Sequence, residues 1–120
     1  MAGITVKKFD KPDETRTPDK TKLEVVELGS GKAARLSVDP GWKWSECIKP
    51  VVGTDSCQVH HVGVVHAGRI AIRHDDGTEL EIGPGEAYVI HPGHDAWIVG
   101  DETFVGYEFE SRAAEEYAKV

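Results

Sequence analysis

A row of alternate residues near the middle of the chain contains three side chains that could hold a metal ion. Asp55, Cys57, Val59 and His61 are each separated by one residue. If residues 55–65 are extended, these side chains share one face, because successive side chains of a strand point to opposite sides. A carboxylate, a thiolate and an imidazole are all metal ligands, and each would need a partner if buried. The spacing therefore indicates a metal or ligand site.

A second pair of ionisable residues, His94 and Asp95, follows a Pro-Gly turn. His94 could join Cys57 and His61 as a third ligand and leave one position open for water or substrate, as in catalytic sites. Asp55 would then be a fourth ligand or would orient the others. Such mixed S, N and O donors suit zinc and also allow iron, copper or nickel. Being adjacent, His94 and Asp95 are also candidates for catalytic proton transfer.

The same residues allow an interpretation without metal. Cys57 would then be a small buried thiol, His61 would hydrogen-bond to the backbone or to Asp55, and the interior would be a plain ligand pocket. Asp95 could equally cap its own turn. Cys47 and Cys57 are predicted to be free thiols, since a lone pair of cysteines in a reducing compartment rarely forms a structural disulfide. Both interpretations of the site stay open at this point.

Aromatic residues could line the same interior. Trp42 and Trp44 alternate with Lys43, which places both indoles on one face, either in a pocket, at a dimer interface or in the core. Tyr88 and Tyr107 are candidate pocket hydroxyls, and Trp97 follows the His94 turn closely enough to join them.

These side chains must be positioned by β-structure, because short alternating runs are separated by Gly, Pro and Asp pairs. The best hairpin spans Arg69–Ile82, with Asp75-Asp76-Gly77 as the reversal. Further strands are predicted at residues 24–28, 33–38, 87–90, 96–99 and 104–109. A short C-terminal helix is predicted over residues 113–118, capped by Ser111. The fold class is therefore mostly β, an antiparallel barrel with a short C-terminal helix.

The beginning of the chain has a different character. Residues 7–22 are almost wholly polar and include two prolines, so this segment cannot bury enough apolar surface to order itself alone. We expect a mobile charged arm over residues 1–22 and a single domain over residues 23–120. Alternatively, the arm orders itself by pairing along a sheet edge, including that of a second subunit.

Composition excludes several function classes. The net charge of the 120-residue chain is −7, and its 14 Lys and Arg are scattered, which argues against nucleic-acid binding. No stretch approaches the roughly 18 apolar residues of a membrane helix, so we expect no membrane partner. The N-terminus lacks the apolar core of a secretory signal, and we expect a cytoplasmic protein.

The segment from Gly53 to Gly100 resembles the paired sequence motifs of the cupin family. Aligning the last glycine of the first motif with Gly68 places Asp55, Cys57 and His61 at the three ligand positions, although none is the family's usual residue. In the second motif Gly85 and the Pro92-Gly93 turn match, while Ala96 occupies the position of the family's histidine. His94 lies two residues earlier and would point to the same side.

The resemblance implies a jelly-roll barrel, also called a double-stranded β-helix, with its site in the barrel mouth. It also implies a homodimer in a bacterial cytosol, and it does not imply one activity, because this fold hosts many. We expect a barrel that binds a small molecule, with or without a divalent metal. The alternatives are a metal-dependent oxygenase or isomerase acting on a small oxygenated substrate, and a dimeric assembly or sensory module without catalysis.

Overall fold

The computed structural model describes residues 3–29 and 31–109, which form nine strands and two short helices. In chain order the strands are β1 (Glu14–Arg16), β2 (Thr21–Glu27), β3 (Lys32–Val38), β4 (His61–Ala67), β5 (Ile70–His74), β6 (Glu79–Ile82), β7 (Ala87–Ile90), β8 (His94–Ile98) and β9 (Phe104–Phe109). The helices α1 (Trp44–Cys47) and α2 (Lys49–Val52) lie between β3 and β4. Neither is long and apolar enough to cross a membrane.

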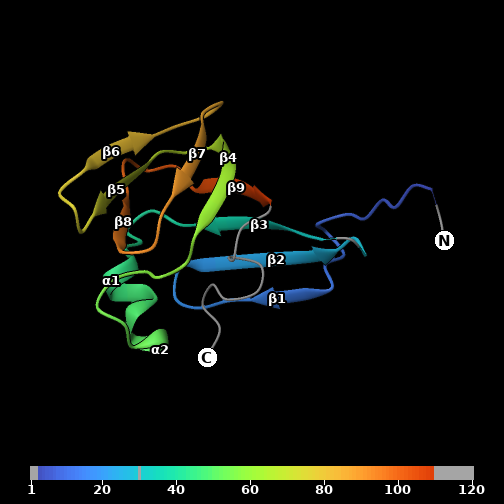
Figure 1. Ribbon diagram of the computed structural model, residues 1–120, viewed down its shortest axis with the longest axis horizontal. Helices are drawn as coiled ribbons and strands as arrows, with labels where there is room; N and C mark the ends of the chain where they lie inside the picture. The colour runs from blue at the N-terminus through green and yellow to red at the C-terminus, as the bar shows by residue number, and fades with distance from the viewer. Residues whose placement is uncertain (1–2, 30, 110–120) are drawn as a thin grey trace.

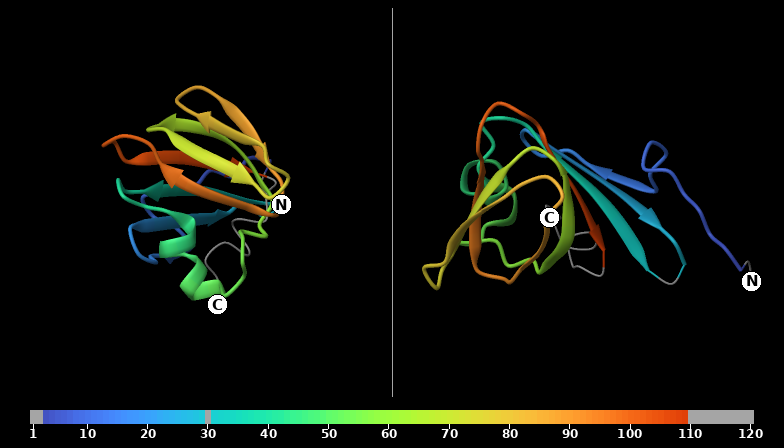
Figure 2. Two further views of the ribbon diagram at one scale, coloured as in Figure 1. Left: turned by 90° about the vertical axis from the view of Figure 1, so that its left-hand side faces the viewer. Right: turned by 90° about the horizontal axis from the view of Figure 1, so that it is seen from above.

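The strands form two antiparallel sheets that face each other around a common interior. The larger sheet has the order β1-β2-β3-β9-β4-β7, and the smaller one has the order β6-β5-β8. Figure 1 shows the smaller sheet beside the helices, and Figure 2 shows both sheets curving around the interior. Several strands that are adjacent in a sheet are far apart in the sequence; β9, for example, lies between β3 and β4. This strand order is typical of a jelly roll.

Alternation along the strands fills the interior with apolar side chains. In β9, Phe104, Gly106 and Glu108 point inward while Val105 and Tyr107 are only half-buried. Trp44, Phe104 and Leu23 are among the largest fully buried side chains. The interior is therefore an apolar core over most of its length, and polar residues on its walls need a specific explanation.

Most predicted strands are confirmed, because their signals are local. The hairpin has the expected register, with Ile70 opposite Ile82 and Ile72 opposite Leu80. Leu80 differs from the other apolar residues on this face of the hairpin, because 64% of its surface is exposed. The helix predicted over residues 113–118 lies outside the described residues.

Part of the predicted arm is a strand. Glu14–Arg16 forms β1 and pairs with Leu23–Val25 of β2, which itself begins at Thr21. The Asp13 carboxylate accepts a hydrogen bond from the Glu27 backbone N–H at 2.7 Å and so fixes the approach to β1. The pairing corresponds to the alternative of an arm ordered along a sheet edge, here the edge of its own sheet.

Gly68 belongs to the glycine framework that the sequence shares with cupins, and its backbone explains why glycine stands there. It turns the chain from β4 to β5 with φ of +78°. A Cβ at this position would also collide with the backbone of Thr103 and Phe104. Any other residue would therefore disturb the approach of β9 to this turn.

Candidate metal centre

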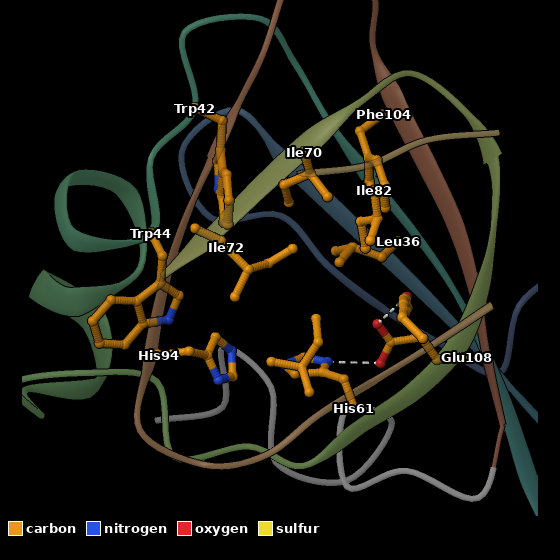
Figure 3. Close-up of a pocket in the computed structure, with 13 residues that line it drawn as sticks. Leu36, Trp42, Trp44, His61, Ile70, Ile72, Ile82, His94, Phe104 and Glu108 are labelled. Atoms are coloured by element: carbon orange, nitrogen blue, oxygen red, sulfur yellow. Dashed lines mark hydrogen bonds and ion pairs between the residues drawn. The ribbon is translucent and has the colours of Figure 1, made fainter. Parts of the chain in front are cut away.

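Three side chains with metal-binding atoms meet inside the jelly roll. Cys57, His61 and His94 each contribute one ligand atom, and these atoms all lie within 4.8 Å of one another. The three residues are 2%, 4% and 3% exposed. Figure 3 shows His61 and His94 pointing into the same pocket from different strands. The sequence prediction that these three residues gather at one place agrees with the structure.

The local backbone places each of the three residues. His61 is the first residue of β4 and faces inward opposite Ile90 of β7. His94 is the first residue of β8 and follows Gly93, whose φ of +99° turns the chain into the strand. Cys57 lies outside the regular strands, but its backbone N–H donates to the His94 carbonyl at 2.7 Å. This bridge holds the thiol beside the histidine.

Both imidazoles are oriented by a hydrogen bond through their Nδ1 atom. His94 Nδ1 donates to the His91 carbonyl at 2.9 Å, and a carbonyl can only accept. His61 Nδ1 lies 2.8 Å from Oε1 of the buried Glu108. The Nε2 atom of His61 therefore faces the cluster, 3.8 Å from the Cys57 sulfur. A metal-binding histidine is usually held by such a partner on its other nitrogen, a carboxylate or a backbone carbonyl.

Glu108 is the residue of this candidate site that the sequence analysis missed. It is 3% exposed and accepts a second hydrogen bond from the Tyr88 hydroxyl, at 2.7 Å from Oε2. A fully buried glutamate is rare unless it is paired. A signal was present in the sequence, because Glu108 alternates with Phe104 and Gly106 on the inner face of a predicted strand.

The electrostatics of the cluster favour a charged thiolate at Cys57. Burial opposes ionisation of Cys57, but hydrogen bonds from His61 and His94 outweigh it and lower the pKa of the thiol to about 6. Burial likewise opposes a charge on His61, but the Glu108 carboxylate and Cys57 raise the pKa of the imidazole to about 10. A carboxylate, an imidazolium and a thiolate thus follow one another across the interior.

The space beside the cluster is small and mostly apolar. A cavity of about 30 Å³ remains in the interior, bordered by His61, His94 and Glu108 and by aromatic and aliphatic side chains. Trp42, Trp44 and Tyr88, three of the predicted pocket residues, line this cavity. By this measure the cavity holds one or two waters or another very small group.

Asp55 is not part of this cluster. The prediction assumed an extended chain from residue 55 onward, whereas the chain bends at Asp55 and Ser56 and becomes a strand only at His61. Asp55 is consequently exposed, and the group of candidate ligands does not include it. The structure corrects the four-residue row to two of its members, Cys57 and His61, with His94 as the third ligand.

Asp95 does not share the interior with His94 either. The two are neighbours in β8, so they point to opposite faces of the sheet. Asp95 instead accepts hydrogen bonds from the backbone N–H of Ser45, at 3.2 Å, and of Ala96, at 2.9 Å. Its carboxylate caps the first turn of α1 from outside, and this geometry removes it as the proton-transfer partner of His94.

Two of the five predicted pocket aromatics also lie elsewhere. Trp97 lies on the outer face of β8, where its ring meets the Lys43 ammonium at 5.9 Å. Tyr107 lies on the outer face of β9, with its ring 5.4 Å from that of Phe9 and 5.8 Å from that of His66. The reason is again the period of two, since the inward neighbours of these residues are Ala96 and Glu108.

The capping role of Asp95 leads to a specific expectation. Asp95→Ala should lower the free energy of unfolding by about 1 kcal/mol, as loss of a helix-capping side chain does. It should leave any metal bound at Cys57 unchanged. Urea denaturation and metal analysis of the same preparation measure the two effects. Loss of metal without loss of stability would contradict the assignment of Asp95 to the outer face.

Comparison with known proteins shows the fold and little else. No known family profile matches the sequence, and no curated protein matches it. Solved structures do match. A cupin 2 conserved barrel protein from Salinispora arenicola aligns with a TM-score of 0.62 at 15% identity, over 90% of this chain and 88% of that one.

Two further structures lead to the same conclusion. A Rhizobium leguminosarum protein of unknown function aligns with a TM-score of 0.63 at 19% identity, covering 90% of this chain and 97% of that one. The cupin domain of Schizosaccharomyces pombe Cnp3 aligns with a TM-score of 0.57 at 16% identity, covering 80% and 66%. Together with the two facing antiparallel sheets, these similarities show that the chain has the cupin fold.

Proposed function

We propose that this protein binds one divalent transition-metal ion through Cys57, His61 and His94 and presents an open coordination position to a small molecule. The observation that carries the proposal is the orientation of both histidines. Each engages an acceptor through Nδ1 and so keeps Nε2 for another partner, and Nε2 of His61 lies 3.8 Å from the Cys57 sulfur. Burying three polar side chains whose ligand atoms converge costs free energy unless a bound group becomes their partner.

The donor set fits such an ion. In a tetrahedral site with bonds of 2.0–2.3 Å, two ligand atoms lie roughly 3.3–3.8 Å apart. Cys57 Sγ and His61 Nε2 are separated by 3.8 Å, and all three ligand atoms lie within 4.8 Å of one another, so a small inward shift would complete the site. One thiolate with two imidazoles suits zinc, iron, copper or nickel better than magnesium or calcium, which prefer oxygen ligands. Three protein ligands are also the number that catalytic zinc sites use.

Residues around the three proposed ligands orient those ligands and control the access of water. Glu108 fixes the His61 ring and is itself held by the Tyr88 hydroxyl. The apolar walls of the cavity exclude bulk water, which strengthens electrostatic interactions inside. When bound, the metal would act as a Lewis acid toward an oxygen-bearing ligand or a water molecule. Binding of a small molecule at the open position is the function that this geometry supports best.

Metal analysis of the purified, untagged protein tests the proposal. We expect close to one equivalent of metal in the wild type and less than about one tenth of that in Cys57→Ser, His61→Ala and His94→Ala, because each removes a ligand. Cys47→Ser and His66→Ala are the matched controls. Cys47 is a second buried thiol and His66 an exposed histidine, and neither belongs to the cluster.

Equal metal in all six proteins would place the ion elsewhere and contradict the site. Absence of metal from the wild type after reconstitution with zinc, iron, copper and nickel would contradict the proposal itself. The same geometry would then favour a second function, in which Cys57 is a nucleophile beside His61, oriented by Glu108. Rapid alkylation of Cys57 by iodoacetamide in the metal-free protein would distinguish this case.

A further inference from the structure

A larger cleft opens between an edge strand of the small sheet and an edge strand of the large sheet. β6 ends the small sheet and β7 ends the large one, and a cleft of about 440 Å³ lies between them. Figure 1 shows the two strands next to each other in the upper part of the molecule. The volume is in the range of small-molecule sites and exceeds that of the inner cavity more than tenfold.

The cleft and the inner cavity share a wall. Ile72, Ile82, Tyr88 and Ile90 line both spaces. Ile90 is also the residue paired with His61 across β7 and β4. A molecule in the cleft would therefore contact the side chains that separate the cleft from the candidate metal ligands. A small group at the inner end of that molecule would face the cavity beside those ligands.

The lining of the cleft is largely apolar and includes side chains that a soluble protein rarely exposes together. Leu80 is 64% exposed and Val89 55% exposed, one from each edge strand. Exposed apolar side chains that flank a cleft mark a binding surface. Burying them under an apolar ligand would contribute binding free energy in proportion to the area removed from water.

The charges at the cleft select against anions. Among the described residues that line it, none is lysine or arginine; two histidines, His74 and His91, also line it, and His74 Nδ1 lies 3.3 Å from Asp76 Oδ1. Its one carboxylate, Asp76, accepts a hydrogen bond from the Thr78 backbone N–H, which lowers the pKa of Asp76 and keeps it negative at neutral pH. The whole chain carries a net charge of −7. A phosphorylated or polycarboxylate ligand would meet the Asp76 carboxylate here and no lysine or arginine.

We propose that this cleft binds a neutral, largely apolar small molecule and directs one end of it toward Cys57, His61 and His94. The role of the inner end of the ligand rests on the proposed function. The class of ligand rests on the cleft alone. It separates this protein from binders of sugar phosphates and of dicarboxylates, whose charged groups need arginine or lysine.

Two dyes with the same ring system and different charge test the inference. N-phenyl-1-naphthylamine is neutral, and 8-anilinonaphthalene-1-sulfonate carries one negative charge. We expect the neutral dye to bind with enhanced, blue-shifted fluorescence and the sulfonate to bind at least about tenfold more weakly, because of Asp76 and the absence of a cation. Asp76→Asn should reduce the difference in affinity between the two dyes.

Variants at the rim place the dye in the cleft. Leu80→Glu and Val89→Glu should each weaken binding of the neutral dye by about tenfold or more, since both put a charge against an apolar ligand. Both side chains are exposed, so neither change should disturb folding. Ile4→Glu is the matched control, because Ile4 is 82% exposed and does not line the cleft.

Equal affinity for the two dyes, or unchanged binding in both rim variants, would overturn the inference. A dimer by light scattering that Leu80→Glu dissociates would also overturn it and assign the cleft to a second copy of the chain. Cys57→Ser keeps this test separate from that of the metal site. If Cys57→Ser loses its metal and still binds the dye, both proposals are supported. If the wild type binds the dye but never takes up metal, the ligand site in the cleft is supported and the metal function is contradicted.

Discussion

Glu108→Ala is expected to lower the free energy of unfolding by about 3–5 kcal/mol, the cost of removing one partner of a buried charged pair. The side chain accepts hydrogen bonds from His61 and from Tyr88, and all three residues are buried. Alanine leaves both donors without an acceptor and opens a cavity in their place. The loss should therefore far exceed that of an average core substitution.

Urea denaturation followed by circular dichroism measures this effect. Glu108→Gln is the conservative variant, which keeps the shape of the side chain and one acceptor oxygen, and it should cost less than half as much. Glu102→Ala, at an exposed position, is the control and should change stability by less than about 0.5 kcal/mol. A cost for Glu108→Ala no greater than that of the control would show that the buried pair does not stabilise the fold.

The same residue shows where prediction from the sequence ended. The hairpin and most of the other strands follow from local patterns, and these predictions are confirmed. Glu108 approaches His61 only because β9 pairs with β4, where Gly63 lies opposite Glu108. That pairing joins segments more than 40 residues apart, and no local pattern in one sequence specifies it.

The error at Asp55 has a local physical cause. Period-two alternation holds only inside a strand, and Asp55 lies in a bend before β4 begins. Cys57 reaches the cluster by a backbone bridge to His94 rather than by sharing a strand face with His61. Applied within β8, however, the same rule separates Asp95 from His94 and correctly places Ala96 inside. The rule was sound, and the assumed start of the strand was wrong.

Metal uptake by the protein should become stronger as pH rises, by about tenfold per pH unit between pH 6.5 and 8.5. In the metal-free protein the pKa of Cys57 is about 6 and that of His61 about 10. In this pH range the thiol is therefore already ionised, while His61 still holds a proton that a metal must displace. Because bound metal replaces that proton, each unit of pH favours the complex, and the dissociation constant for zinc should fall roughly 100-fold over the range.

Competition with a zinc-binding dye at several pH values measures this slope, and Glu108→Gln shows its origin. The Glu108 carboxylate is the charge that raises the pKa of His61, so an uncharged amide should let that pKa fall and flatten the dependence on pH. Affinity at pH 8.5 should at the same time be about 10–100-fold weaker, because the His61 ring loses its charged partner. A slope as steep in Glu108→Gln as in the wild type would show that the displaced proton does not come from His61, and a flat wild-type profile would mean that the metal-free site carries no proton there to displace.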